Sequence, residues 1–588
     1  MKSLLVLWLT IFSLALNAQT NYWQNKIDAS LWKKAEAGTL VECIVVLKQQ
    51  ADLSLANNLK TKEEKGNFVF NSLQTTARES QKPILQLLQN EKARYQSFFM
   101  LNAIYTQADA RLLRQLAERE EVAYLADNPA IPLQLPTVAS ADEVASRSAI
   151  EWGIQRINAD QVWALGYKGQ GVVVGGQDTG YEWTHPAIQG KYRGWNGSVA
   201  NHNYNWHDAI HKINPLNGDT TNTAANPCGV NSKVPCDDNS HGTHTMGTMV
   251  GDDGKGNQIG VAPDARWIAV RNMERGWGSP ASYIESFEWF IAPTNLEGRN
   301  PDPSKAPHVI NNSWGCPPVE GCNESNFTLM NSVVNNVRAA GIVVVASAGN
   351  SGNNCSTVSD PASIFAGSFS IGASRQNDTI ALFSSRGPVS VDGSNRLKPN
   401  VVAPGVGVRS AVRGGGYANF NGTSMAGPHV AGLVALMISA NPDLAGQVEK
   451  IETIIEETAK PMQTTENCGG LSGLQIPNNT YGYGRVDALA AVERALQLTA
   501  DTDDIKNNIK VSVFPNPTEQ NITFKIEGVN GKTELQLFNA AGQQLQYLQW
   551  DAQHISLQPL DLQNLPTGIY IYRLKNGGTT TSGKIVKQ

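Results

Sequence analysis

The sequence predicts an α/β protein whose central domain is a parallel sheet with helices on both faces. A small α+β domain is expected before it and an all-β sandwich after it. Three observations support this prediction. Glycine-bounded, valine-rich runs alternate with helical patterns in the middle of the chain, strand and helix patterns share the first part, and strand patterns separated by turns fill the end.

Length and composition limit the number and the kind of domains that the chain can form. A chain of 588 residues is too long for one hydrophobic core. Its 41% hydrophobic and 17% charged residues describe a globular protein, and its net charge of -5 is small for this length. Since no basic block occurs, nucleic acid is not an expected partner.

Residues 1–18 have the pattern of a signal peptide. Lys2 precedes an apolar run from Leu4 to Leu16, and Ala18 offers a small residue for cleavage. The alternative is a membrane anchor, but the run is short for a span of ~20 residues and no stop-transfer charges follow. No later segment is long enough to cross a bilayer, so we expect export without a transmembrane segment.

Residues 19–140 are expected to form the small α+β domain. The β-branched string "LVECIVVLKQQ" predicts a strand, and the pattern from about Lys65 to Arg94 is helical. The string "RLLRQLAEREEVAYLADNPAIPL" predicts a second helix that leads into another strand.

Residues 141–500 are expected to contain the parallel sheet. Buried strands are predicted at "GVVVGG", "WIAVRNM", "HVINNSWG", "GIVVVASAGN" and "SFSIGAS". Asp178 and Asn350 both fall where such a strand ends. The carboxyl edge of an open α/β sheet is where ligands bind. The polar stretch 501–508 reads as a linker, and residues 509–588 as the β-sandwich.

Three glycine-rich motifs carry the residue types of a catalytic triad. Asp178 lies in "VVVGGQDTG", His241 in "DNSHGTHTMGTMVG" and Ser424 in "FNGTSMAGPHVAG". A serine nucleophile needs a base such as imidazole, and the base needs a carboxylate that fixes its tautomer. Pro428 suits only the first turn of a helix, which places a helix start at or beside Ser424. Taken alone, Ser424 could be an ordinary N-cap.

Asn350, in "VVVASAGNSG", is a candidate donor for an oxyanion. Its side-chain amide and the backbone N–H of Ser424 could stabilise the charge that forms on a substrate carbonyl. The alternative is a turn asparagine, since Asn-Ser-Gly is good turn chemistry.

With these four residues and their motifs, the chain resembles the subtilisin-like serine peptidases (subtilases), and among them the bacillopeptidase F-like members. The resemblance implies a secreted serine endopeptidase that hydrolyses proteins and peptides through an acyl-enzyme and needs no cofactor for its chemistry. It also implies that residues 19–140 are an inhibitory propeptide, removed by autoprocessing between Thr137 and Glu151. The alternative is a secreted binding protein on an inactive subtilase fold.

The resemblance also implies substrate contacts. Ser313, Trp314 and Gly315 match the strand that pairs with the substrate backbone. The opposite wall of the pocket for the residue before the scissile bond corresponds to Ser347, Ala348 and Gly349, and Ser359 falls near its floor. Asp360, beside Ser359, would favour a basic side chain if it pointed into the pocket.

Two further segments have alternative interpretations. The loop "GDDGKGNQIG" places Asp252, Asp253 and Asn257 where several subtilases bind structural calcium, but such loops are commonly plain turns. Asp178 and His241 are 241 − 178 = 63 residues apart, about double the spacing of the smallest subtilisins. The extra residues could flank the substrate cleft or form a surface insertion.

Seven cysteines fit an exported protein. Cys43 lies in the expected propeptide. Sequence proximity suggests the pairs Cys228–Cys236 and Cys316–Cys322, which would leave Cys355 for Cys468. Six cysteines allow about 15 connectivities, so other pairings remain open.

The C-terminal domain carries three motifs in order, "FPNPT", "LPTGIYIYRL" and "GKIVKQ". They resemble the sorting domain of the type IX secretion system, and the alternative is a carbohydrate-binding or cell-wall module. The resemblance implies that the type IX machinery is a partner and that the protein is secreted or held at the cell surface.

Overall fold

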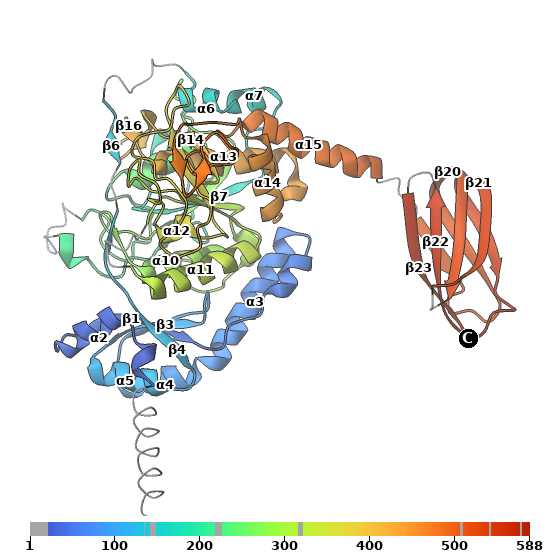
Figure 1. The fold of residues 1–588 in the computed structure, drawn as a ribbon, viewed down its shortest axis with the longest axis horizontal. Helices are drawn as coiled ribbons and strands as arrows, with labels where there is room; N and C mark the ends of the chain where they lie inside the picture. Colours follow the sequence, from blue (N-terminus) through green and yellow to red (C-terminus); the bar gives the residue numbers. More distant parts are fainter. Residues whose placement is uncertain are drawn as a thin grey trace, which may run out of the picture. The chain divides into compact units, whose positions relative to one another are not determined.

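The computed structural model describes residues 22–133, 136–140, 149–217, 226–315, 322–505, 510–539, 542–576 and 579–588. The expected signal peptide, residues 1–18, lies outside the described residues. Two compact units divide the chain, Met1–Ala495 and Leu496–Gln588 (Figure 1).

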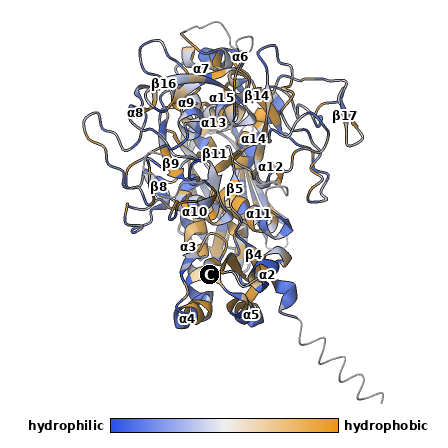
Figure 2. Ribbon diagram, turned by 90° about the vertical axis from the view of Figure 1, so that its left-hand side faces the viewer, coloured by the Kyte–Doolittle hydropathy of each residue, from blue (hydrophilic) through white to orange (hydrophobic). Residues whose placement is uncertain are grey.

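The N-terminal region is α+β, as predicted. Its antiparallel sheet has the order β2-β3-β1-β4, formed by β1 (Val41–Leu47), β2 (Tyr95–Phe98), β3 (Ala103–Ala108) and β4 (Val122–Asp127). One face of this sheet is covered by α2 (Ala29–Glu36), α4 (Lys82–Asn90) and α5 (Ala110–Glu118). These helices are amphipathic: in α5, Leu112, Leu113 and Leu116 are buried. Hydrophobic and hydrophilic residues therefore alternate along α4 and α5 in Figure 2.

The central sheet has seven strands, all parallel, in the order β14-β13-β12-β11-β7-β9-β8. Its strands are β7 (Val173–Asp178), β8 (Trp206–Asp208), β9 (Arg266–Arg271), β11 (Val309–Asn312), β12 (Val343–Ser347), β13 (Phe369–Ser374) and β14 (Val401–Pro404). Every residue of β11, β12 and β13 is buried, because helices cover both faces. The predicted parallel sheet is confirmed.

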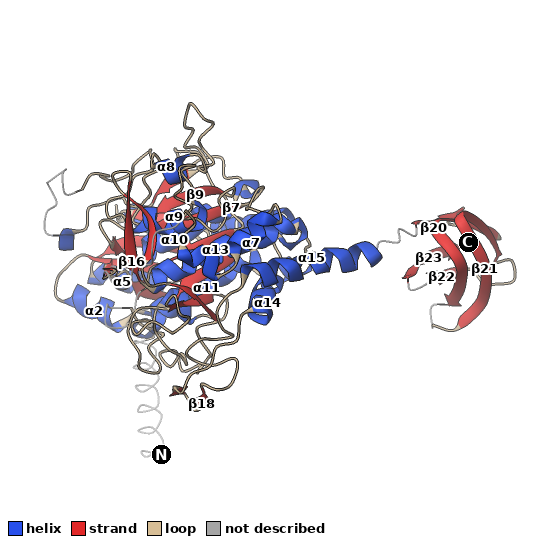
Figure 3. Ribbon diagram, turned by 90° about the horizontal axis from the view of Figure 1, so that it is seen from above, coloured by secondary structure: helices blue, strands red, loops and turns tan. Residues whose placement is uncertain are grey.

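Consecutive residues of β12 face different helices. Val344 packs into a cluster with α10 (Pro280–Ile291) and α11 (Glu324–Ala339). Val345 lies beside Gly427 of α13 (Thr423–Ala440), which packs against α9 (His241–Val250). This alternation follows from the two-residue period of a strand. Figure 3 shows the helices around the strands of this sheet.

Smaller elements complete the first unit. The helices are α3 (Lys62–Ser80), α6 (Trp152–Arg156), α7 (Ala159–Ala164), α8 (Pro186–Gln189), α12 (Pro361–Ile364) and α14 (Val448–Thr458). The strands are β5 (Ile131–Pro132), β6 (Thr137–Val138), β10 (Trp277–Gly278), β15 (Val408–Val412), β16 (Gly416–Asn421), β17 (Asn467–Cys468) and β18 (Leu471–Ser472).

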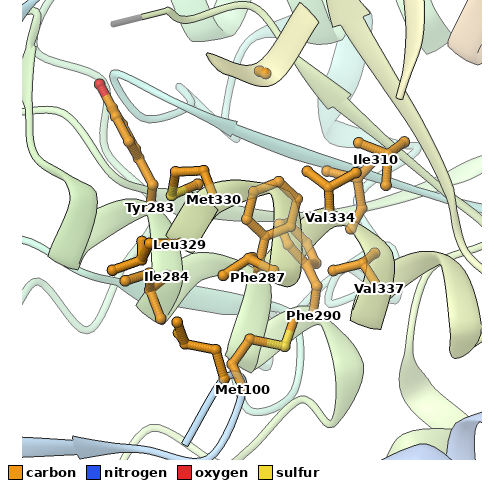
Figure 4. Packing of buried hydrophobic residues seen from close by; sticks show 14 of the residues in the cluster. Met100, Tyr283, Ile284, Phe287, Phe290, Ile310, Leu329, Met330, Val334 and Val337 are labelled. Carbon is orange, nitrogen blue, oxygen red and sulfur yellow. The ribbon is translucent and has the colours of Figure 1, made fainter. Parts of the chain in front are cut away.

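The N-terminal region packs against helices α10 and α11 of the central domain. Met100, from the turn between β2 and β3, joins the same buried cluster as Phe287 of α10 and Val334 of α11 (Figure 4). Phe70 and Leu73 of α3 belong to it as well. Burial of apolar area is the main force in such an association, so this interface is a substantial one.

From Lys510 onward the described part of the second unit is all-β. Its antiparallel strands are β19 (Lys510–Phe514), β20 (Asn521–Asn539), β21 (Gln544–Asp561), β22 (Gly568–Asn576) and β23 (Thr579–Lys587). Alternate residues of β22, among them Tyr570, Tyr572 and Leu574, point into one hydrophobic cluster. Helix α15 (Ala488–Ile505) continues through the first half of the segment that was expected to be a linker.

Two predicted disulfides are present, Cys228–Cys236 and Cys355–Cys468. Cys316 lies outside the described residues, so its predicted pairing with Cys322 is not tested. Cys43 is a free, buried cysteine. Among the described residues, α13 is the one helix long and apolar enough to span a membrane, and 94% of that stretch is buried inside the protein.

Candidate active site

The predicted site residues meet at the carboxyl edge of the central sheet. Asp178 is the last residue of β7, and Ser313 and Asn350 follow the neighbouring strands β11 and β12. Helices α9 and α13, which pack against each other, begin at His241 and beside Ser424. Parallel strands end at the same edge, so residues far apart in the sequence come together there.

Asp178 orients His241. The Nδ1 of His241 lies 2.6 Å from Oδ1 of Asp178, and both side chains are buried. The backbone N–H of Thr179 donates to the same oxygen at 2.7 Å. Because a carboxylate only accepts, Nδ1 carries the proton. Nε2 of His241 is left as the acceptor, and it has no hydrogen-bond partner among the described residues.

The backbone before His241 has an unusual conformation. Ser240 adopts φ 93°, in the left-handed region that residues other than glycine rarely enter. Asp237 accepts hydrogen bonds from the N–H groups of Asn239, Ser240 and Thr243, which hold this turn in place. Such strain persists only where the surroundings fix it, as is common at functional sites.

Ser424 is the second residue of α13 and is buried. Its Oγ lies 3.4 Å from the carbonyl oxygen of Ser313. The predicted helix start is confirmed, but the stated reason is wrong, because Pro428 is the sixth residue of the helix and lies beyond the first turn. A proline has no N–H for the carbonyl four residues earlier, here that of Ser424. The Oγ of Ser313 donates to this carbonyl instead, at 3.3 Å.

The orientation of Asn350 follows from its partners. Its Oδ1 accepts from the backbone N–H of Thr423 at 2.9 Å and from the Oγ1 of Thr423 at 3.0 Å. A backbone N–H can only donate, so the side-chain oxygen must point at Thr423. The Nδ2 group is then the free end of the amide, and Asn350 lines the same pocket as Ser424.

That pocket contains most of the predicted substrate contacts. Ser313, Trp314 and Gly315 form one wall, and Ser347 and Gly349 belong to the opposite side. Trp314 is fixed by stacking on Tyr283, with ring centroids 3.7 Å apart.

Two predicted contacts do not line the pocket. Ala348 is fully buried behind it, and Ser359 is half-buried outside the lining. Asp360, and not Ser359, lines the pocket, with its carboxylate beside Gly315 and Gly349.

The N-terminal region runs through the cleft on both sides of Ser424. Strand β5 pairs antiparallel with β10, and the N–H of Leu133 donates to the carbonyl of Gly276 at 2.6 Å. Leu133 also lines the pocket of Ser424. Beyond it, β6 pairs antiparallel with β16, which ends three residues before Ser424. The described parts of the N-terminal region thus come close to Ser424 at Leu133, in its pocket, and at Pro136, which lies beside Gly422.

The candidate calcium ligands are engaged by protein donors. Asp253 accepts hydrogen bonds from the N–H of Lys255 and from Tyr417, and Asp252 accepts one from the N–H of Gly254. The Oδ1 of Asn257 accepts from the guanidinium of Arg409 at 2.7 Å. A cation beside a would-be ligand opposes a second cation there. This geometry does not favour calcium at the loop, and calcium binding stays a prediction.

Comparison with known proteins agrees with this geometry. Residues 169–484 match the subtilase family, and these cover more than half of the chain. The chain belongs to the subtilase family. Residues 512–588 match a secretion system C-terminal sorting domain, which indicates export to the cell surface or beyond.

Individual relatives are bacterial proteases. Bacillopeptidase F of Bacillus subtilis (strain 168) is 35% identical over 503 residues, which are 80% of this chain but 32% of that protein. M-protease of Shouchella clausii (strain KSM-K16) is 31% identical, over 60% of this chain and 74% of its own. Subtilisin Savinase of Lederbergia lenta is 31% identical, over 58% of this chain and 98% of its own. The chain thus spans about a third of bacillopeptidase F.

Sequence reasoning missed one residue of the interface between the N-terminal region and the central domain. The Oε2 of Glu288, on α10, accepts from the backbone N–H groups of Phe99 and Met100 at 2.6 and 2.9 Å. Nothing in the local sequence marks this glutamate, because its partners are backbone groups nearly two hundred residues away.

Proposed function

We propose that the protein is the precursor of a secreted serine endopeptidase, with Ser424 as nucleophile, His241 as general base and acid, and Asp178 as the orienting carboxylate. Asn350 supplies the side-chain donor of the oxyanion hole. The single observation that carries the proposal is the passage of the protein's own N-terminal region through the cleft beside Ser424. A chain held on both sides of a serine nucleophile is placed as a substrate is.

The chemistry follows from the hydrogen bonds of the site. The free Nε2 of His241 takes the proton of Ser424 as Oγ attacks the scissile carbonyl carbon. Asp178 holds Nδ1–H and stabilises the imidazolium that results. His241 then protonates the leaving amine, and water hydrolyses the acyl-enzyme by the same steps in reverse order.

Two donors face the developing oxyanion. One is Nδ2 of Asn350, whose oxygen end is held by Thr423. The other is the backbone N–H of Ser424, which lies in the first turn of α13 where amides have no carbonyl partner within the helix. The positive end of the helix dipole adds to their effect.

Maturation by self-cleavage is part of the proposal. We infer that the scissile bond lies between Leu133 and Pro136, because β5 and β6 pair with the central domain on the two sides of this stretch. This is earlier than the expected removal point, between Thr137 and Glu151. After cleavage, residues 22–133 remain packed against α10 and α11 and block the cleft, which makes them an inhibitor in trans.

Export is assigned to the C-terminal unit. The sorting domain at residues 512–588 is the segment that a secretion system recognises, and we infer from its motifs that this is the type IX system. The partners of the protein are then its protein substrates, its own propeptide and this machinery.

The proposal is tested by comparing the full-length protein with its Ser424→Ala variant. We expect the wild type to digest casein and to release a propeptide that ends between Leu133 and Pro136, as determined by mass spectrometry. The variant should stay full-length and inert, because loss of the nucleophile lowers subtilisin turnover by up to about 10⁶. If both proteins behave alike, the proposal is wrong and a binding function on this fold takes its place.

A further inference from the structure

Asp360 belongs to the pocket that opens beside Ser424, and its surroundings there are unusual for a carboxylate. It is 6% exposed and lines the pocket together with Ser313, Gly349 and Ser424. An aspartate at the start of a helix commonly caps it, but the side chain of Asp360 makes no capping hydrogen bond to α12. The carboxylate is therefore turned away from its own helix.

Two glycines make room for this carboxylate. A Cβ atom on Gly315 would lie 2.4 Å from Oδ1 of Asp360, and one on Gly349 would lie 2.6 Å from Oδ2. Each of these distances is well below a van der Waals contact, so a larger residue on either wall would collide with the carboxylate. The two oxygens of Asp360 thus lie between the walls formed by the ends of β11 and β12.

Among the residues that the structure describes, no cationic side chain forms an ion pair with Asp360. None of the other described residues that line the pocket is ionisable. Ser385 lies close to Gly349 of the pocket wall, and the residue after it is Arg386. The guanidinium of Arg386 forms an ion pair with Glu466. Burial without a compensating cation raises the pKa of Asp360 to about 7. A cation that enters the pocket strongly stabilises the charged form of a carboxylate buried in this way.

We propose that the enzyme cleaves after lysine or arginine, and that the cationic end of this side chain pairs with Asp360. The inference rests on the proposed function, since the pocket is a specificity pocket only if Ser424 is the nucleophile. Gly315, Ser347 and Gly349 present no side chain or a small one to the pocket, so a residue that reaches Asp360 between them has to be long and unbranched. Lysine and arginine have the length and the charge that this path selects.

Self-cleavage is compatible with this preference. The segment from Leu133 to Pro136 contains no lysine or arginine, and its one amide side chain, that of Gln134, can donate hydrogen bonds but carries no charge. An intramolecular cleavage depends less on side-chain binding in the pocket, because the substrate segment is part of the same chain and is present at a high effective concentration. Cleavage of other proteins lacks that advantage and depends on the cation.

The test uses peptides that differ only in the residue before the scissile bond, namely lysine, arginine, glutamine or leucine. For the mature wild type we expect kcat/KM to be about 10² to 10³ higher for lysine and arginine than for leucine, as for a buried charge pair. Asp360→Asn should abolish most of this ratio and leave leucine cleavage within a few fold. Ser359→Ala, next to it but outside the pocket lining, should keep the ratio.

The pH dependence of the same ratio provides a second readout. Below pH 7 Asp360 is protonated and neutral, and above it the carboxylate is charged. The lysine-to-leucine ratio should therefore rise as the pH increases through 7. Taking a ratio cancels the titration of groups that both substrates need, and in Asp360→Asn the ratio should stay flat.

The outcomes distinguish a failure of the proposed protease function from a failure of the proposed preference for lysine and arginine. If the wild type hydrolyses none of the peptides and no casein, the proposed function itself fails. If it hydrolyses leucine and lysine peptides equally at pH 8, the specificity proposal is overturned and the protease remains. If Asp360→Asn is inactive towards every peptide, the variant gives no ratio. The specificity proposal is then tested by the lysine-to-leucine ratio of the wild type and by the pH dependence of that ratio.

Discussion

At the scale of single residues, the site depends on side chains whose orientation is fixed by backbone groups. Asn350 is the clearest example, since two donors of Thr423 determine which end of its amide faces the pocket. Ser313 similarly takes the place of the missing proline N–H at the carbonyl of Ser424. These contacts orient the proposed catalytic groups before any substrate binds, which is what electrostatic catalysis requires.

Replacing Asn350 by alanine tests its role as an oxyanion donor. We expect kcat to fall by about 10² to 10³ with little change in KM, the range known for removing such a donor from a subtilisin. Asn350→Asp, of equal size but without the N–H donor, should be at least as slow. Steady-state kinetics on one peptide measures both variants, and a kcat within three-fold of wild type would show that Asn350 is only a turn residue.

At the scale of elements, the two helices that carry His241 and Ser424 also contain buried, neutral histidines. His244 on α9 lies 3.1 Å from the carbonyl of Val408, and His429 on α13 lies 2.8 Å from that of Met425. Burial lowers the pKa of His244 to about 3 and that of His429 to about 4. Both helices are therefore packed around imidazoles that stay uncharged at neutral pH.

These histidines should destabilise the fold in acid. The unfolded chain binds their protons near pH ~6.5, whereas the folded chain does not until pH 4 or below. Stability is therefore lost as the pH falls from ~6.5 towards 4, by roughly 2 kcal/mol for each histidine at pH 5.

Denaturant unfolding of the inert Ser424→Ala protein at pH 7 and pH 5 measures this loss. Adding His429→Gln should make the loss between the two pH values smaller by roughly 2 kcal/mol, whatever it does to the stability at pH 7. An unchanged difference between pH 7 and pH 5 would mean that His429 is charged in the folded protein.

At the scale of the whole molecule, the first unit joins the subtilase domain to the N-terminal region over one continuous core. Met100 and Phe287 pack in the same cluster, and Glu288 binds two backbone N–H groups of that region. The C-terminal unit has a separate core of its own. We therefore expect inhibition to be a property of the first unit and export a property of the second.

Glu288→Ala should weaken inhibition of the mature enzyme by added propeptide. Two partly buried N–H groups lose their acceptor, and each unsatisfied group costs about 1 to 3 kcal/mol, so we expect the inhibition constant to rise about 30-fold or more. Glu288→Gln keeps an acceptor oxygen and should lose less. Casein hydrolysis without propeptide serves as the control for both variants. An inhibition constant unchanged in Glu288→Ala would place the binding energy elsewhere in the interface.

Part of this protein could be read from the sequence alone. The parallel sheet, the all-β C-terminal domain and the motifs of Asp178, His241, Asn350 and Ser424 are local patterns: strand periodicity, glycine spacing and helix-start chemistry are set by neighbours in the chain. The chain's membership in the subtilase family was therefore already predicted from the motifs of these residues.

Other features were decided by the tertiary structure. Asp360, rather than Ser359, reaches the pocket because two glycines from different strands leave space for it. Glu288 meets the N-terminal region, and β5 and β6 pair with the central domain, through contacts between residues more than a hundred positions apart. The direction of one side chain and the register of distant strands depend on packing between elements, and no local pattern encodes that.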